Sequence, residues 1–402
     1  MLHQPARHEP LCKLPWNEPA ARRFMQALAD QACQHFDPLT LWRTHPRDVE
    51  PGEAALPIAC LYLGAAGVIW ALQHLKRHAD VSVELDFTAC IDGLIEHNRR
   101  FNLASGIESP SYLFGDAGVL LLQWRATHSV AVAQSLFDTV QANLRNPSLE
   151  PLWGSSGTMV AALHMLEATR EDRWQQLFCE SAQILCDQMH LAAGFDNTWI
   201  WTQLLYGKRI DYLGAGHGFA GNMFPFVRGA QWLPPPLVET MTDRAAQVFR
   251  VSALTEDDRV NWEPVFDHLG AGLPSKLLLQ DCHGAPGIIC RLAGSPSPAL
   301  RALLQQAGEA VWAAGPLNKG PGLCHGTAGN GYAFLKLHAM TGEVLWLERA
   351  RAFAMHAMAQ SDAEAGLQGA RRYSLWTGDL GVAVFVWGCI AGDAAFPTLD
   401  VF

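Results

Sequence analysis

A short glycine motif recurs seven times along this 402-residue chain, and it constrains the fold more than any other feature. Each copy has the pattern G-x-x-G and is followed by an apolar run such as VIWALQHL, TMVAALHML or NGYAFLKL. The copies are GAAG at Gly64, GDAG at Gly115, GSSG at Gly154, GFAG at Gly218, GAPG at Gly284, GTAG at Gly326 and GDLG at Gly378. Because the runs are apolar on almost every side, they predict helices that are buried all round.

Longer amphipathic segments lie between these copies. AVAQSLFDTVQANL and ALRALLQQAGEAVWAAG, for example, have apolar residues at three-and-four spacing, which indicates helices buried on one side only. The alternation predicts an all-α fold, an α/α toroid in which seven inner helices are wrapped by seven outer ones. An open helical solenoid is the alternative, but its two kinds of helix would be more equal in hydrophobicity and its ends would carry polar caps. We expect residues 1–402 to form a single toroid domain, with the repeats between about residues 55 and 390.

The charge and the hydropathy of the chain exclude several classes of partner. With 39 acidic and 29 basic residues, the formal net charge is -10, whereas nucleic acids and anionic membranes favour clustered Lys and Arg. The first residues, MLHQPARHEPLCKLPWNEP, lack the apolar core of a signal peptide, and no segment approaches about eighteen uninterrupted apolar residues. We therefore expect a cytoplasmic protein with no transmembrane segment and no nucleic-acid partner.

Two neighbouring turns carry the same reactive residues. The fifth turn, DCHGAPG, contains Cys282 and His283, and the sixth, LCHGTAG, contains Cys324 and His325. Thiolate sulfur and imidazole nitrogen are the ligands that zinc prefers, so two such pairs at equivalent places in a repeat predict a zinc site. All four residues would give a closed structural site, and three would leave one position open for water or substrate. A cysteine-protease-like pair would not explain why the motif occurs twice.

Other polar residues near the turns are weaker candidates. His217 lies in the fourth turn, AGHGFAG, although a lone histidine is more often a satisfied core residue. Glu150 precedes the third turn, where a solvated loop carboxylate is the default interpretation. Two aspartates within the turns could cap the following helices, and three basic residues ahead of the sixth and seventh turns could line the cavity or sit in solvent. These are Asp116 and Asp379, and Lys319, Arg371 and Arg372.

The motifs LGAGHGFAG, CHGAPGI, KGPGLCHGTAGNGYAFLKL and YSLWTGDLG resemble the lanthionine synthetase C-like family, over roughly residues 55 to 390. The sixth-turn segment is the most specific of them and is closer to the eukaryotic-type branch. The resemblance implies the seven-plus-seven toroid and one zinc ion in its central cavity. It assigns Cys282, Cys324 and His325 as the three protein ligands, with one position left open. His283 would contact the substrate or a ligand instead of the metal.

The resemblance also implies a reaction, the addition of a thiol to dehydroalanine or dehydrobutyrine in a peptide or protein, which forms a thioether. Zinc promotes loss of the thiol proton, His217 matches the general acid that protonates the enolate, and Glu150 would take the thiol proton or orient His217. Lys319 matches a lysine of the eukaryotic-type branch, whose members bind glutathione. Together with Arg371 and Arg372 it forms the expected glutathione-binding set.

Two positions depart from the family pattern. Asp281 stands where the family usually has tryptophan, and Leu278 stands where the bacterial cyclases tend to have arginine. Both changes argue against a classical lantibiotic precursor as substrate. The match at Lys319 favours glutathione as the thiol donor, with a cysteine of the peptide as the alternative. The expected partners are a dehydrated peptide or protein and glutathione, and a dehydratase or kinase partner is left open. The alternative function is a non-catalytic zinc- and glutathione-binding sensor or scaffold. Glycoside or terpenoid chemistry would need a carboxylate pair that the turns do not offer.

Overall fold

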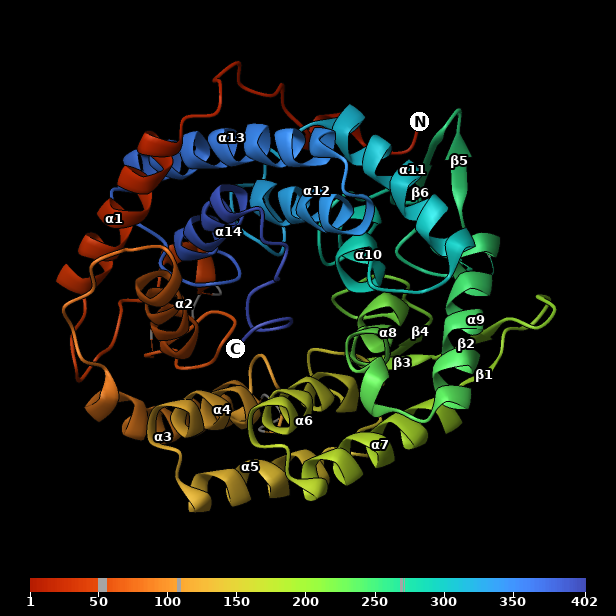
Figure 1. The fold of residues 1–402 in the computed structure, drawn as a ribbon, viewed down its shortest axis with the longest axis horizontal. Coiled ribbons are helices and arrows are strands. Elements are labelled where there is room, and N and C mark those ends of the chain that lie inside the picture. Colours follow the sequence, from red (N-terminus) through yellow and green to blue (C-terminus); the bar gives the residue numbers. More distant parts are fainter. Residues whose placement is uncertain (50–55, 107–109, 268–269, 271) are drawn as a thin grey trace.

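The computed structural model describes residues 1–49, 56–106, 110–267, 270 and 272–402. Within these residues two concentric rings of helices form an α/α toroid (Figure 1), which confirms the predicted fold class. The inner ring consists of α2 (Ala65–His78), α4 (Asp116–Thr127), α6 (Ser155–Thr169), α8 (Phe219–Arg228), α10 (Ala285–Leu292), α12 (Thr327–Thr341) and α14 (Asp379–Ala391). The outer ring consists of α1 (Glu18–Gln34), α3 (Thr88–Ser105), α5 (Val130–Ala142), α7 (Asp172–Asp187), α9 (Pro235–Val251), α11 (Pro298–Ala314) and α13 (Val344–Gln368).

Three small antiparallel hairpins and three short 3-10 helices decorate the rings. The hairpins pair β1 (His190–Leu191) with β2 (Trp199–Ile200), β3 (Gln203–Leu205) with β4 (Lys208–Ile210), and β5 (Leu254–Glu256) with β6 (Arg259–Asn261). The 3-10 helices are Pro5–Arg7, Pro46–Asp48 and Ala230–Trp232. Within the described part of the chain, no helix is long and apolar enough to cross a membrane.

Every inner helix starts inside one of the seven glycine motifs, and the second glycine of the motif has a steric role. A Cβ at Gly67 would overlap the carbonyl oxygen of Leu61, and one at Gly329 would overlap that of Leu323. The second glycine of the other five motifs meets the corresponding carbonyl in the same way. The turn therefore folds back against the first helical residues at a distance that only glycine allows.

The inner ring closes because each inner helix packs against the next, and α14 packs against α2. Side chains at the helix starts tie the two rings together. Asp116 accepts hydrogen bonds from Asn98 and Arg99 of α3, and Asp379 accepts one from Ser361 of α13. Neither carboxylate caps its own helix, since Gly115 and Gly378 occupy the N-cap positions without a side-chain bond.

The residues after α14 turn back into the middle of the ring (Figure 1). The carbonyl oxygen of Thr398 accepts a hydrogen bond from the Tyr112 hydroxyl. The Asp400 carboxylate forms an ion pair with Lys336 of α12 at 2.7 Å. Leu399 lines the central cavity. This C-terminal segment, residues 393–402, therefore lies in the middle of the ring and contributes Leu399 to the lining of the cavity.

Candidate metal centre

The turns before the inner helices are joined to one another by backbone hydrogen bonds. Each turn contributes one equivalent residue, which lies two positions before the first glycine of its motif. These residues follow one another round the ring. They are Tyr62, Leu113, Leu152, Gly216, Cys282, Cys324 and Trp376. The amide N–H of Gly216 donates to the carbonyl of Cys282, that of Cys282 to Cys324, that of Cys324 to Trp376 and that of Trp376 to Tyr62. The ring thus brings equivalent side chains from neighbouring repeats together.

Cys282, Cys324 and His325 place their ligand atoms within 4.8 Å of one another. The two cysteines are buried, and His325 is partly exposed to the cavity. Cys324 Sγ lies 3.5 Å from His325 Nε2, and sulfur and nitrogen ligands of a tetrahedral zinc ion lie about 3.6 Å apart. The donor types and their spacing therefore fit zinc, as the sequence predicts for these three residues.

The two thiols share an environment that favours one thiolate. A hydrogen bond from Cys324, and after it the neighbouring histidines, hold the pKa of the Cys282 thiol well below its usual range despite burial. Burial and the adjacent Cys282 sulfur raise the pKa of Cys324. A cation at this place would favour the thiolate form of both groups.

His217, which lines the same cavity, is paired with the buried Glu150 behind it. His217 Nδ1 lies 3.0 Å from Glu150 Oε2, and the Glu150 side chain is completely buried. The backbone N–H groups of Leu152 and Trp153 also donate to the Glu150 carboxylate. Since both carboxylate oxygens are already engaged, the arrangement favours orientation of His217 over removal of a thiol proton by Glu150.

His283 lies outside the group of metal donors. Its ring is 6.0 Å from that of His217 and 5.7 Å from that of Tyr212, both in the preceding repeat. Burial lowers the pKa of His283, and its Nδ1 atom has no hydrogen-bond partner among the described residues. The His283 ring lines the cavity beside His217, and its Nδ1 atom, unpartnered in the part of the chain that the structure describes, is buried.

A cavity of about 300 Å³ is lined by His217, Cys282, His283, Cys324 and His325. Four cations line it. Arg291 is paired with Asp281, whereas Lys319, Arg7 and Lys276 form no ion pair within the described chain. Leu278 lines the same cavity. Asp281 forms a buried ion pair with Arg291 at 2.8 Å, and burial raises the pKa of the Asp281 carboxyl to about 6 although Arg291 opposes the shift.

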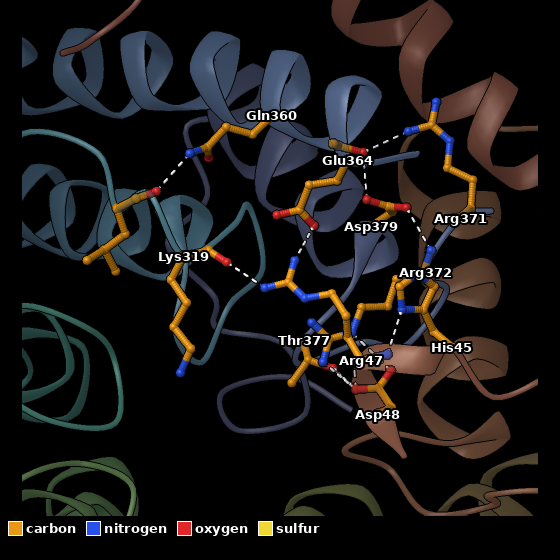
Figure 2. A network of polar contacts seen from close by, with 12 residues as sticks. His45, Arg47, Asp48, Lys319, Gln360, Glu364, Arg371, Arg372, Thr377 and Asp379 are labelled. Carbon is orange, nitrogen blue, oxygen red and sulfur yellow. Dashed lines mark hydrogen bonds and ion pairs between the residues drawn. The ribbon is translucent and has the colours of Figure 1, made fainter. Parts of the chain in front are cut away.

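The other two basic candidates, Arg371 and Arg372, belong to a network of polar contacts (Figure 2). Arg372 binds the Asp48 carboxylate and lines an adjoining pocket of about 420 Å³, which shares Lys319 and His325 with the central cavity. Arg371 is paired with Asp362 at 2.6 Å and donates to Ser361, so it lines neither pocket. In Figure 2 the Lys319 side chain extends away from this network, while its carbonyl accepts a hydrogen bond from Arg47.

Sequence reasoning missed three residues at the centre. Tyr62 holds the position of the zinc cysteines in the first turn, and its hydroxyl interacts with Cys324. Gln280 holds the position of Glu150 in the fifth turn and donates to Cys282. Alignment of the seven turns would have identified both. Arg7 lies far from the repeats in sequence, and no local pattern indicates its place.

The chain is similar to several known proteins. The family model for lanthionine synthetase C-like proteins matches residues 59–401. "Glutathione S-transferase LANCL1" of Danio rerio is 27% identical over 322 residues, 72% of this chain and 74% of the relative. "LanC-like protein GCL1" of Arabidopsis thaliana is 43% identical over 90 residues, 21% of each chain.

Among solved structures, one titled "Nisin cyclase" has a similar fold, with a TM-score of 0.63 and 14% sequence identity over 92% of this chain and 94% of its own. The two curated relatives come from an animal and a plant, which confirms the expected resemblance to the eukaryotic-type branch. The family model covers most of the chain, including all three donor residues. This chain belongs to the lanthionine synthetase C-like family.

Proposed function

We propose that the chain is a zinc-dependent enzyme that adds a thiol to dehydroalanine or dehydrobutyrine in a peptide or protein. The observation that carries the proposal is the convergence of Cys282, Cys324 and His325 in a cavity that is also lined by His217, whose ring is held by Glu150. Zinc held by the three donors would lower the pKa of a substrate thiol and keep its sulfur next to the electrophile.

His217 supplies the proton that completes the addition. The sulfur forms a bond to the β-carbon, the double bond becomes an enolate, and the α-carbon must then take up a proton. Glu150 holds His217 through Nδ1, which leaves Nε2 to face the cavity. The thiol releases one proton and the α-carbon takes up one proton. The addition therefore consumes no net proton, and His217 needs no outside acid. His283 contacts the substrate from the neighbouring turn.

Glutathione is the proposed thiol donor. It carries two carboxylates, and the cavity presents Lys319, Arg7 and Lys276 without ionic partners in the described chain. Arg372 borders the adjoining pocket, but its charge is already paired with Asp48. The name of the Danio rerio relative, a glutathione S-transferase, supports this donor. We propose that Lys319 is the main residue that binds glutathione and that Arg372 contributes less. Arg371 supports Asp379 instead.

The test uses a cysteine-free dehydroalanine peptide, incubated with the zinc-loaded protein with and without glutathione and analysed by mass. We expect a gain of one glutathione per dehydroalanine, which disappears when zinc is removed by a chelator or when Cys324→Ala replaces the wild type. Cys33→Ala, which changes a thiol on α1 far from the cavity, serves as the matched control and should retain the activity.

Two results would overturn the proposal. Full turnover by the metal-free protein would exclude the zinc centre from the reaction. Zinc-dependent glutathione binding without any adduct would instead identify a sensor or scaffold. A second peptide that carries its own cysteine distinguishes cyclisation, in which free thiol is lost at constant mass, from the addition of glutathione.

A further inference from the structure

The side chain of Gln280 connects Arg7 to the sulfur of Cys282. Arg7 Nη2 lies 3.0 Å from Gln280 Oε1, and Gln280 Nε2 lies 2.9 Å from Cys282 Sγ. Gln280 is buried, with 5% of its surface exposed. Its backbone is also fixed, because Gln280 and His283 exchange two backbone hydrogen bonds across the fifth turn.

Arg7 determines which end of the Gln280 amide faces the sulfur. A guanidinium group can only donate hydrogen bonds, so the amide oxygen must face Arg7 and the amide N–H₂ must face Cys282. Arg7 itself is held in place by the segment around it. The backbone N–H of Asn318 donates to the Arg7 carbonyl, and His8 Nδ1 lies 2.9 Å from the carbonyl oxygen of Gly315. Cys282 therefore receives a hydrogen bond from a donor of fixed orientation.

Such a hydrogen bond has a chemical consequence in this cavity. During the proposed reaction an electrophilic alkene lies close to three sulfur atoms: Cys282, Cys324 and the thiol substrate. Attack by Cys282 would form a Sγ–Cβ bond, move the electron pair to the α-carbon and take up one proton there, which would inactivate the centre. A charge-assisted N–H···S bond withdraws electron density from a thiolate and makes it a poorer nucleophile.

We propose that Gln280, oriented by Arg7, is a positioning residue that hydrogen-bonds the Cys282 thiolate and thereby directs the electrophile to the substrate sulfur. The proposal rests on the proposed function for the identity of the electrophile. Its observable consequence, the reactivity of Cys282 itself, can be measured without turnover.

The experiment compares self-alkylation of the wild type and Gln280→Leu. Both proteins are loaded with zinc to one ion per chain, verified by metal analysis, and incubated with acrylamide or a dehydroalanine peptide in the absence of thiol. Peptide mapping by mass then gives the alkylation rate at each cysteine. We expect about a tenfold faster reaction at Cys282 in Gln280→Leu, the effect of one charge-assisted hydrogen bond, and an unchanged rate at Cys324.

Two further variants keep the test decisive. Gln280→His retains an N–H donor and should restore slow alkylation. Arg7→Met leaves the amide free to turn and should give an intermediate rate, and it replaces Gln280→Leu if that variant does not fold. With cobalt in place of zinc, the sulfur-to-cobalt charge-transfer band should shift in Gln280→Leu and return in Gln280→His.

Equal alkylation of Cys282 in the wild type and in Gln280→Leu, at equal metal content, would overturn the proposal. So would an equal increase at Cys324, because that result would indicate a general loosening of the centre. Failure of the proposed function would be seen separately, as absence of the glutathione adduct in the wild type, while the difference at Cys282 would persist.

Discussion

The fifth and sixth turns have the same sequence, Cys-His-Gly, but only one of their histidines joins the metal donors. His325 lies with Cys282 and Cys324, whereas His283 faces Tyr212 and His217. The difference comes from the direction in which each histidine side chain extends. The histidine of each turn reaches toward the preceding turn: His325 toward Cys282, His283 toward the fourth turn and His217 toward Glu150 in the third.

The preceding turn thus decides what each histidine does. The fifth turn offers a cysteine to His325. The fourth turn has Gly216 at that position, so His283 meets no sulfur there. Gly216 is also required sterically, since a Cβ at this residue would lie 2.8 Å from the Cβ of Cys282. Identical motifs acquire different roles because the repeat fixes the direction of the histidine side chain, while the residue in the preceding turn determines its partner.

The largest expected effect separates the two histidines. His325→Asn removes one of three donors, so we expect zinc affinity to fall by at least about 100-fold, more than the loss typical of groups that only support a ligand. His283→Asn should still bind one zinc per chain with near wild-type affinity. Competition with a chromophoric chelator measures both. Equal losses in the two variants would contradict the assignment of ligands.

Glu150→Gln tests the third and fourth turns, where the histidine meets a carboxylate instead of a sulfur. We expect the rate of thioether formation to fall by about 100-fold, the lower range for a general acid, while zinc stays bound. Glu167→Gln, which removes a carboxylate of α6 outside the cavity, is the matched control and should keep the wild-type rate. Wild-type activity in Glu150→Gln would exclude the role proposed for this pair.

Gly216→Ala tests the steric part of the comparison. The added methyl group must displace Cys282, so we expect a loss of about 1–3 kcal/mol in the free energy of unfolding together with weaker zinc binding. Gly93→Ala is the control, because a Cβ there meets no atom within 4 Å on the outer helix α3 and alanine favours a helix. Chemical denaturation measures both, and opposite signs are expected.

A smaller effect concerns the seventh turn, where Asp379 stands in place of Ala285 of the fifth. Burial raises the pKa of Asp379 to about 6 from an ordinary 3.8, against the hydrogen bond from Ser361 and the charge of Arg371. The folded state therefore holds this proton more tightly, and the resulting stability is complete below pH 3.8 and is lost as pH rises through about 6. Relative to Asp379→Asn, the wild type should lose on the order of 1 kcal/mol between pH 4 and 7. Thermal unfolding across this range checks it, and a pH-independent difference would contradict it.

The sequence was sufficient for the ring, because the ring follows from a repeat, whereas the choice of three donors among the four Cys and His residues came from the family resemblance and stays a prediction. Glycines at fixed places and fully apolar runs identify the inner helices, and the doubled Cys-His pair marks the turns that meet. Asp116 and Asp379, for which the sequence left helix capping open, do not cap their helices, since both carboxylates bind groups of other segments. The contacts of Arg7 and Arg372 could not be predicted, because they join segments with no shared pattern, Arg7 to Gln280 and Arg372 to Asp48.

The C-terminal segment at the cavity has a kinetic consequence. Leu399 lines the cavity and its neighbours are anchored to Tyr112 and Lys336, so in the proposed reaction we expect reactants and product to share an entrance away from this segment. The thiol must reach the deeper position beside the cysteines, and the larger dehydrated peptide then covers the entrance. The thiol should therefore bind first, and excess peptide should inhibit the reaction by occupying the route of the thiol.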